Sequence, residues 1–490
     1  MKGRTSFCLF LLLLAASPFL WASDLPPLTL GECVRRALER GFDMEIGGHD
    51  LQIARDRLID AQSDFDPLIS ASASQSVLRS AVSAVAPRTR SDSLSTSFGI
   101  SQRLPFGANL GLRTDLGRSQ LDPAGDAMNP AYDSDVTLTL RQPLLKGFGR
   151  TVTMAGVRSA EIGLESAAHS YRGLAMDIIL AVENSYYFLA GAREQLEVLR
   201  TSLQLANRLL DEARARRAAG MATKLDVLQA EVGVANARRA VLEAESTVRT
   251  AEEALLALIG RFELDGPLGP TVIDDSISGP LPEVESSYAA ALQRHPALAM
   301  ARASLDLARL SEALAKDDLK PFLDLDIAVG VAGRADSGRG AFSDAFDADS
   351  SRWQAGISLI YPLGRVGEKA RYRQSQAAAR QQELRLQRLE QDILVDVRSA
   401  VRDVHTAYES VQIAALAVEL SEEQYEAENA RFRSGLSTSR RVLEAQTDLE
   451  RARLAELQQR LNLRTALARL RRIEGSSLDY YGIELPVPAD

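Results

Sequence analysis

Hydrophobic positions along this chain follow two periods, and the two periods alternate twice. Stretches with an apolar side chain every three or four residues are typical of amphipathic helices, and stretches with every second residue apolar are typical of half-buried strands. The helical period predicts helices over 29–64, 152–218, 222–259, 287–319, 367–434 and 437–474. The alternating period predicts strands within 67–142, over 322–332 and over 353–361.

The second half of the chain repeats the first. A shift of 215 residues pairs Gly220 with Gly435 and Thr223 with Thr438, whereas nearer the N-terminus a shift of 254 residues pairs Pro67 with Pro321. The two shifts differ because the first half has a longer strand region. We therefore interpret the chain as one helix–strands–long helix–helix unit built twice. Its parts are a first repeat over 24–260, a Pro- and Gly-containing linker over 261–286, a second repeat over 287–475 and a tail over 476–490.

Each repeat contains one sharp reversal between two long helical stretches. Gly220 and Gly435 can adopt the positive φ that ends a helix, and each is followed three residues later by a threonine, Thr223 or Thr438, that can cap the next helix. The sequence thus predicts a helical hairpin that occurs twice. The long stretch before the second reversal has neither Gly nor Pro from Glu368 to Ser434, which is roughly 100 Å of helix at about 1.5 Å per residue.

The helix after the first reversal has two apolar rows. Small and β-branched residues recur every seven positions, which predicts a coiled-coil seam; its members include Val227, Val234, Val241, Val248, Ala230, Ala237, Ala244 and Ala251. A patchier second row is formed by Leu228, Ala235, Leu242 and Leu256. A helix in a two-stranded coil needs one seam, so two rows predict a neighbour on each side.

The predicted strands have one apolar face and one face of Ser, Thr and Asp, which suits lipid on one side and water on the other. Strands in a bilayer must close into a barrel, because open edges leave backbone groups unpaired. Two or three hairpins are too few for a barrel within one chain, so the sequence predicts an oligomer that pools its strands. Polar loops are expected over about 79–93, 117–134 and 333–351. Four prolines mark the strand–helix junctions, where strand pairing is expected to stop: Pro67, Pro143, Pro321 and Pro362.

The N-terminus predicts export. Residues 1–23 have a basic start, a short apolar run and small residues at the end, as in a cleaved signal peptide. No later run of about 18 apolar residues would form a membrane-spanning helix. The net charge of −9 argues against nucleic-acid binding. Cys33 is the one cysteine after the signal, and we expect it to be a small buried residue.

No enzyme chemistry is visible in the sequence. The four histidines are scattered without the spacing of metal ligands, and there is neither a Gly-rich phosphate loop nor a nucleophile elbow. We therefore predict no catalytic, cofactor-binding or metal-binding residues, and any energy source must lie in a partner.

Three motifs resemble the TolC-like outer-membrane efflux proteins. They are the duplicated Gly-x-x-Thr tip, the segment Gln142–Gly149 (QPLLKGFG) and the opening Leu28–Val34 (LTLGECV). The resemblance spans essentially the whole mature chain. It implies a mixed, mainly α fold in which a trimeric transmembrane β-barrel, commonly of twelve strands, continues into a long periplasmic α-helical barrel.

The same resemblance implies partners and a location. We expect a homotrimer in the lipid of the Gram-negative outer membrane, docked onto a periplasmic adaptor protein and an inner-membrane transporter. The strand-like segments near 94–116 depart from four strands per protomer, so four or six remain open.

Members of this family close their periplasmic entrance at the hairpin tips, where acidic side chains ring the pore. By position, Asp226 matches the acidic site of the first tip. In the second tip the matching residue is Arg441, whereas Glu444 keeps a carboxylate one turn later. We hypothesise that Glu444 faces the lumen and that Arg441 pairs with Asp226 of a neighbouring hairpin; the alternative is solvated charges on the tip.

Two other functions compete with the exit duct. An exported periplasmic adaptor or coiled-coil scaffold would have helical seams too, but an adaptor has one hairpin flanked by small β domains rather than two matched halves. An exported enzyme is disfavoured because no constellation of residues supports it.

Overall fold

The structure, a computed structural model, describes residues 28–80, 89–122, 128–260, 268–272, 280–347 and 350–485. The backbone divides into two units. One is built from residues up to Gly41 with 181–280 and 406–465, and the other from 42–180, 281–405 and the residues after 465. The predicted signal peptide, residues 1–23, lies outside the described residues, as do most of the predicted linker and the end of the tail.

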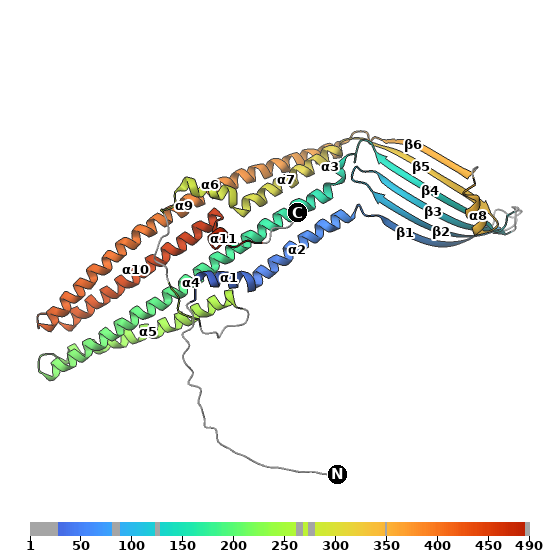
Figure 1. Cartoon of the computed structure of the whole chain (residues 1–490). Helices are drawn as coiled ribbons and strands as arrows, with labels where there is room; N and C mark the ends of the chain where they lie inside the picture. Colours follow the sequence, from blue (N-terminus) through green and yellow to red (C-terminus); the bar gives the residue numbers. More distant parts are fainter. Residues whose placement is uncertain are drawn as a thin grey trace, which may run out of the picture. The chain divides into compact units, whose positions relative to one another are not determined.

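Six strands form one antiparallel sheet in which every strand pairs with its neighbours in the sequence (Figure 1). They are β1 (Leu68–Ser80), β2 (Thr89–Arg103), β3 (Asn109–Asp122), β4 (Ala131–Pro143), β5 (Phe322–Ala335) and β6 (Ser351–Ile360). Of the two possibilities, four or six strands per protomer, the residues that the structure describes form six. The additional pair, β2 and β3, lies within the sheet between β1 and β4 rather than packing elsewhere.

The register separates the two faces of the sheet across all six strands. One cross-strand row is wholly apolar and runs Ile69, Ile100, Leu112, Leu138, Val329 and Trp353. The adjacent row faces the other way and runs Ser70, Gly99, Arg113, Thr137, Gly330 and Arg352. Because β2 and β3 continue both rows, they belong to the same two-faced surface as the other four strands.

On the polar face, glycine makes room for an ion pair. Arg352 of β6 donates to the Thr137 hydroxyl of β4 at 3.0 Å and pairs with the Asp135 carboxylate, although β5 lies between these two strands. The intervening residue is Gly330, where a Cβ would stand 2.7 Å from Thr137 Oγ1. A larger residue there would occupy the space beside Thr137.

The strands are longer than the sequence pattern predicted. The expected loops at 79–93 and 117–134 were wrong at their ends, because residues 89–93, 117–122 and 131–134 are paired in the sheet. The loop expected at 333–351 was also wrong in part, because β5 extends to Ala335 and a short helix, α8 (Gly338–Asp344), follows. These strand ends are rich in Ser, Asp and Arg, so apolar alternation cannot reveal them.

The helices keep the predicted order. Before the first strand come α1 (Leu30–Arg40) and α2 (Phe42–Ser63); α3 (Arg150–Thr153), α4 (Ala155–Ala218) and α5 (Lys224–Ile259) follow β4; α6 (Val284–Arg294) and α7 (Pro296–Asp317) precede β5; and α9 (Val366–Arg433), α10 (Ser439–Glu474) and α11 (Ser477–Tyr480) follow β6. None of the helices in the described residues is long and apolar enough to cross a membrane.

The single helices predicted over 29–64 and 287–319 were wrong, because each is broken once. The breaks fall at Gly41 and His295, which the shift of 254 residues makes equivalent. Both residues have extended backbone, and both donate their N–H to the fourth residue back, at 2.8 Å and 2.9 Å. In the second repeat the cause is Pro296, which has no N–H and disfavours helical geometry at the residue before it.

The predicted seam of α5 is confirmed. Its residues pack against α4 in two clusters, one around Leu196 and Leu199 and one around Leu210 and Ala213. The second row is only partly covered: Leu256 is buried, whereas Leu228 and Leu242 are 46% and 61% exposed. Cys33 is fully buried, as expected, and burial raises the pKa of its thiol to about 12.

The four junction prolines lie where helix and strand meet, with one difference from the prediction. Pairing does not stop at Pro143, because the Leu144 N–H still donates to the Leu323 carbonyl at 2.7 Å. Just beyond it, the N–H of Gly147 donates to the Asp317 carboxylate at 2.7 Å. The QPLLKGFG segment thus attaches the end of β4 to the end of α7.

Candidate functional site: the hairpin tips and the groove beside them

The two reversals have the same backbone geometry. Gly220 and Gly435 have φ of +75° and +77°. In each tip the glycine N–H donates to the carbonyl three residues back, and the next residue donates to the carbonyl five back: Met221 to Arg216 at 2.8 Å, and Leu436 to Arg431 at 2.9 Å. This pair of bonds satisfies the last carbonyls of the helix and fixes the reversal. The prediction that glycine ends both helices is confirmed.

The caps that begin the return helices differ. In the first tip Thr223 and Asp226 form a reciprocal capping box: the Thr223 hydroxyl accepts from the Asp226 N–H at 3.2 Å, and the Asp226 carboxylate accepts from the Thr223 N–H at 2.8 Å. Hydrogen bonds from the Thr223 hydroxyl and backbone N–H lower the pKa of Asp226. In the second tip Arg441 stands where Asp226 does, and it cannot accept a hydrogen bond. Its N–H donates instead to the Thr438 carbonyl at 3.1 Å.

The two tips contact each other within the chain. Arg216, at the end of α4, donates to the Phe432 carbonyl at 2.5 Å and places its guanidinium 4.0 Å from the centre of the Phe432 ring. The Ser439 hydroxyl donates to the second oxygen of Asp226 over a long 3.5 Å. Sequence reasoning missed Arg216, Phe432 and Ser439, because these contacts join residues more than 200 positions apart.

The residues predicted to form the entrance lie at the two hairpin tips, at one end of the unit that contains both tips. Few of them form hydrogen bonds or ion pairs with each other. Glu444 pairs with Arg440 on the same helix, at 2.8 Å. Arg441 is exposed and makes no ion pair within the part of the chain that the structure describes. Asp226 is engaged by Thr223 and Ser439. Pairing between subunits is not visible in one chain and stays a prediction.

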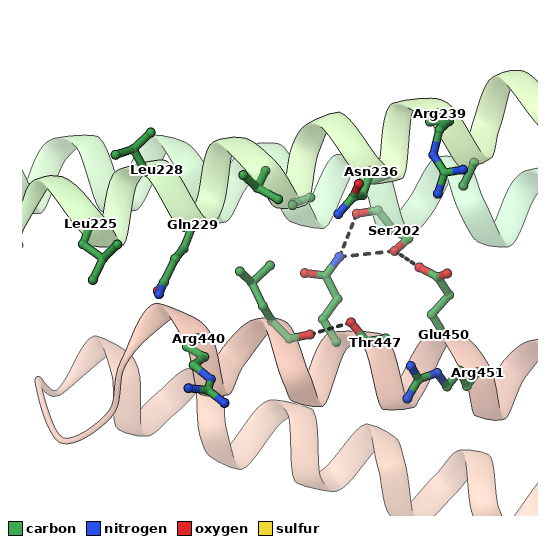
Figure 2. A pocket seen from close by; sticks show the side chains of 17 residues that line it. Ser202, Leu225, Leu228, Gln229, Asn236, Arg239, Arg440, Thr447, Glu450 and Arg451 are labelled. Atoms are coloured by element: carbon green, nitrogen blue, oxygen red, sulfur yellow. Dashed lines mark hydrogen bonds between the residues drawn. The ribbon is translucent and has the colours of Figure 1, made fainter.

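A groove of about 840 Å³ lies next to the tips, between α5 and α10 (Figure 2). Its rim has Leu225 and Leu228 on α5 and Arg440 and Arg451 on α10. Leu225, Leu228 and Val232 are all more than 40% exposed. An apolar rim of this kind, open to water beside charged residues, is typical of a protein-binding surface.

The floor of the groove is polar and rigidly held. Gln446 of α10 is buried and donates to the Ser202 carbonyl at 2.8 Å and to its hydroxyl at 3.3 Å. The Ser202 hydroxyl in turn donates to Glu450. These bonds tie α10 to α4 beneath the opening. Gly233 contributes to the narrow fit, since a Cβ there would lie 3.1 Å from the Leu443 side chain.

Comparison with known proteins decides the family. The profile of the outer membrane efflux protein family matches residues 33–261 and 288–476, which is most of the chain. The chain belongs to this family. The match leaves a gap across the predicted linker and covers both repeats. The family consists of outer-membrane channel proteins rather than enzymes, and membership places this chain in the outer membrane of a Gram-negative cell with its helices extending into the periplasm.

Individual relatives agree with this family assignment. The pyoverdine export outer membrane protein OpmQ of Pseudomonas aeruginosa is 27% identical over 326 residues, covering 64% of this chain and 66% of that protein. The outer membrane protein TolC of Escherichia coli is 25% identical over 308 residues, covering 60% and 62%. The aligned part is thus slightly less than two thirds of each relative's length. A solved structure of CusC superposes with a TM-score of 0.69 at 15% identity, covering 93% of this chain and 94% of that one. The fold is TolC-like.

Proposed function

We propose that this chain is the passive exit duct of a tripartite efflux pump or type I secretion system. Three copies form a channel through the outer membrane, and cargo delivered by an inner-membrane transporter leaves through it. The family assignment supports an outer-membrane channel. The trimer, the partners and the gate described below are our inference.

The observation that carries the proposal is the pair of open edges on the sheet. Within the described residues, β1 and β6 each pair on one side only, and the sheet between them has an exposed apolar face. Unpaired backbone groups next to lipid are strongly unfavourable, so both edges must pair with other copies. Three copies of the sheet supply eighteen strands, which is enough for a wide, water-filled barrel.

The helices give independent support for assembly. Leu228 and Leu242, in the second row of α5, remain 46% and 61% exposed within the described residues, although the seam on the other side of the same helix is buried. Coverage by a neighbouring subunit would remove this apolar surface from water. Leu228, the member of this row nearest the tip, lines the groove, and we propose that a helical hairpin of the periplasmic adaptor docks there.

We further propose that the tips close the entrance through charge. Asp226 has one oxygen held firmly by Thr223, whereas its other oxygen makes only the 3.5 Å contact with Ser439. That oxygen can accept from Arg441 of a neighbouring subunit without disturbing the cap.

The duct is tested by purifying the full-length protein from outer membranes in detergent. We expect a trimer by native mass spectrometry and by crosslinking, insolubility in Sarkosyl, and channels after reconstitution into planar bilayers. A monomer that stays soluble in water and forms no channels would contradict the proposal, and would favour a periplasmic adaptor or scaffold.

A further inference from the structure

The short helix α8 lies on the apolar face of the sheet, near the ends of β4 and β5 that are remote from the junction prolines (Figure 1). It begins at a cap in which Ser337 accepts from the Gly340 N–H at 3.3 Å. Its place on this face follows from the register: Gly333 pairs with Ser134, two residues from Val331 and Val136 on the same side.

The contact between α8 and the sheet is close and specific. A Cβ on Gly333 would lie 2.1 Å from the Ala341 carbonyl oxygen and 2.3 Å from the Ala345 nitrogen, so only glycine admits the helix. The buried Ser134 hydroxyl donates to the Ala341 carbonyl at 2.7 Å. The N–H of Arg334 donates to the Asp344 carboxylate at 3.0 Å. The helix is therefore packed against the sheet through specific contacts.

Two aromatic rings are exposed at the C-terminal end of α8, with Phe342 in the helix and Phe346 two residues after its last residue. Ala341 and Ala345 are fully buried, whereas Phe342 and Phe346 are 49% and 61% exposed. Their ring centres are 5.3 Å apart with planes at 60°. Two large apolar rings held in water are unfavourable, because each would be stabilised by removal from water.

We propose that α8 is a lipid-contacting element, with Phe342 and Phe346 inserted at the headgroup boundary of the outer leaflet. The proposal rests on the proposed function, in which the apolar face of the sheet meets lipid. The face beneath α8 is continuous with the row that contains Leu138, Val329 and Trp353, so the occupant of that face extends to α8. Aromatic rings at the end of an apolar barrel surface mark the level of the lipid interface.

The charged residues of α8 support a position at the membrane surface rather than deeper in the bilayer. Arg339, Asp344 and Asp347 are exposed on or beside α8. Charged groups remain in water at the membrane surface, while the two aromatic rings at the end of α8 enter the acyl region. A helix with this arrangement lies in the plane of the interface.

The test uses tryptophan fluorescence of the reconstituted full-length trimer. Phe346→Trp is made in a Trp353→Phe background, and the vesicles contain phosphatidylcholine brominated either near the headgroup or near the chain ends. We expect strong quenching of the new tryptophan by the shallow bromines, weak quenching by the deep ones, and little quenching by aqueous iodide. The matched control is Phe188→Trp on α4, an equally exposed phenylalanine that should be quenched by iodide and by neither lipid.

The parent protein separates the failure of this inference from that of the proposed function. If Trp353 of the parent is not quenched by brominated lipid, the apolar face does not meet lipid and the duct itself is contradicted. If Trp353 is quenched but the tryptophan at position 346 responds to iodide alone, to deep bromines most, or to no quencher, then α8 is in water, in the bilayer core or under protein, and the inference is overturned. Phe342→Trp gives the same readout if the first variant does not assemble.

Discussion

Asp226 and Arg441 occupy equivalent positions in the two repeats but have opposite charges and different constraints. Asp226 completes a capping box, and the side chain is fixed by Thr223. Arg441 has no such partner in the described part of its own chain, whereas the adjacent Arg440 pairs with Glu444. The family resemblance pointed to Asp226 as the acidic site, and the shift of 215 residues identified Arg441 as its equivalent in the second tip. Its cap was implied by the spacing, but its contact with Ser439 was not, because that contact depends on how the two hairpins pack.

The substitution Arg441→Ala tests whether pairing of Arg441 with Asp226 of a neighbouring subunit closes the entrance. Three exposed ion pairs, each worth about 0.2–1 kcal/mol, would be lost from the closed trimer. The ratio of open to closed channels should therefore rise by a factor of about 3 to about 160. Single-channel recordings in planar bilayers measure this ratio directly.

The matched control is Arg440→Ala, which removes a neighbouring cation that pairs within its own helix. We expect it to leave open probability close to that of the parent. If both variants behave alike, or if Arg441→Ala changes neither conductance nor open probability, the tip charges are merely solvated.

At the scale of elements, the sequence predicted which segments are helix and which are strand, but not where they end. Apolar alternation identifies the part of a strand that faces lipid. It says nothing about residues 89–93 or 131–134, where both faces are polar and only cross-strand pairing maintains the strand. The break at Gly41 has no proline to signal it, whereas the break at His295 was readable from Pro296. The helix α8 was missed because a helix of seven residues shows too few turns for a period.

The groove between α5 and α10 gives a prediction for these elements. In the double variant Leu228→Arg and Val232→Arg, two cations replace apolar side chains on the rim. Adaptor capture should fall by at least about tenfold, because central apolar contacts dominate such interfaces. The measurement is in-cell photo-crosslinking from position 236, with the crosslinked peptide identified by mass spectrometry.

The control is Leu420→Arg, an exposed leucine of α9 that does not line the groove and lies outside the α5 row proposed to meet a neighbouring subunit. It should retain capture from position 236, and all variants must first be shown to assemble. A crosslinked peptide that is not from a helical hairpin, or one whose yield the double variant does not change, would place the adaptor elsewhere.

At the scale of the whole molecule, the two repeats differ by one hairpin. The shifts of 215 and 254 residues differ by 39, and β2 with β3 and their turn spans 89–122. The sequence therefore predicted a longer first strand region, but not that the extra residues join the same sheet. Only the unbroken row from Ile69 through Ile100, Leu112 and Leu138 establishes that.

Deleting residues 89–122 should leave a functional protein. β1 and β4 run in opposite directions and both continue the same apolar row, so they can pair once the hairpin between them is gone. The assembled trimer should have twelve strands, and a barrel about two thirds as wide, because diameter grows roughly linearly with strand number. Electron cryomicroscopy of the trimer measures both quantities. Loss of outer-membrane assembly in a variant whose helices remain folded would show that the hairpin is indispensable.

Because a hairpin starts and finishes at the same rim of the sheet, inserting or removing one leaves the chain's entry to the next helix untouched. In the proposed threefold assembly, adding or removing one hairpin per subunit changes the number of strands in the barrel by six. The bore of the proposed duct can thereby change in discrete sizes, while the helices that we propose meet the adaptor keep their dimensions.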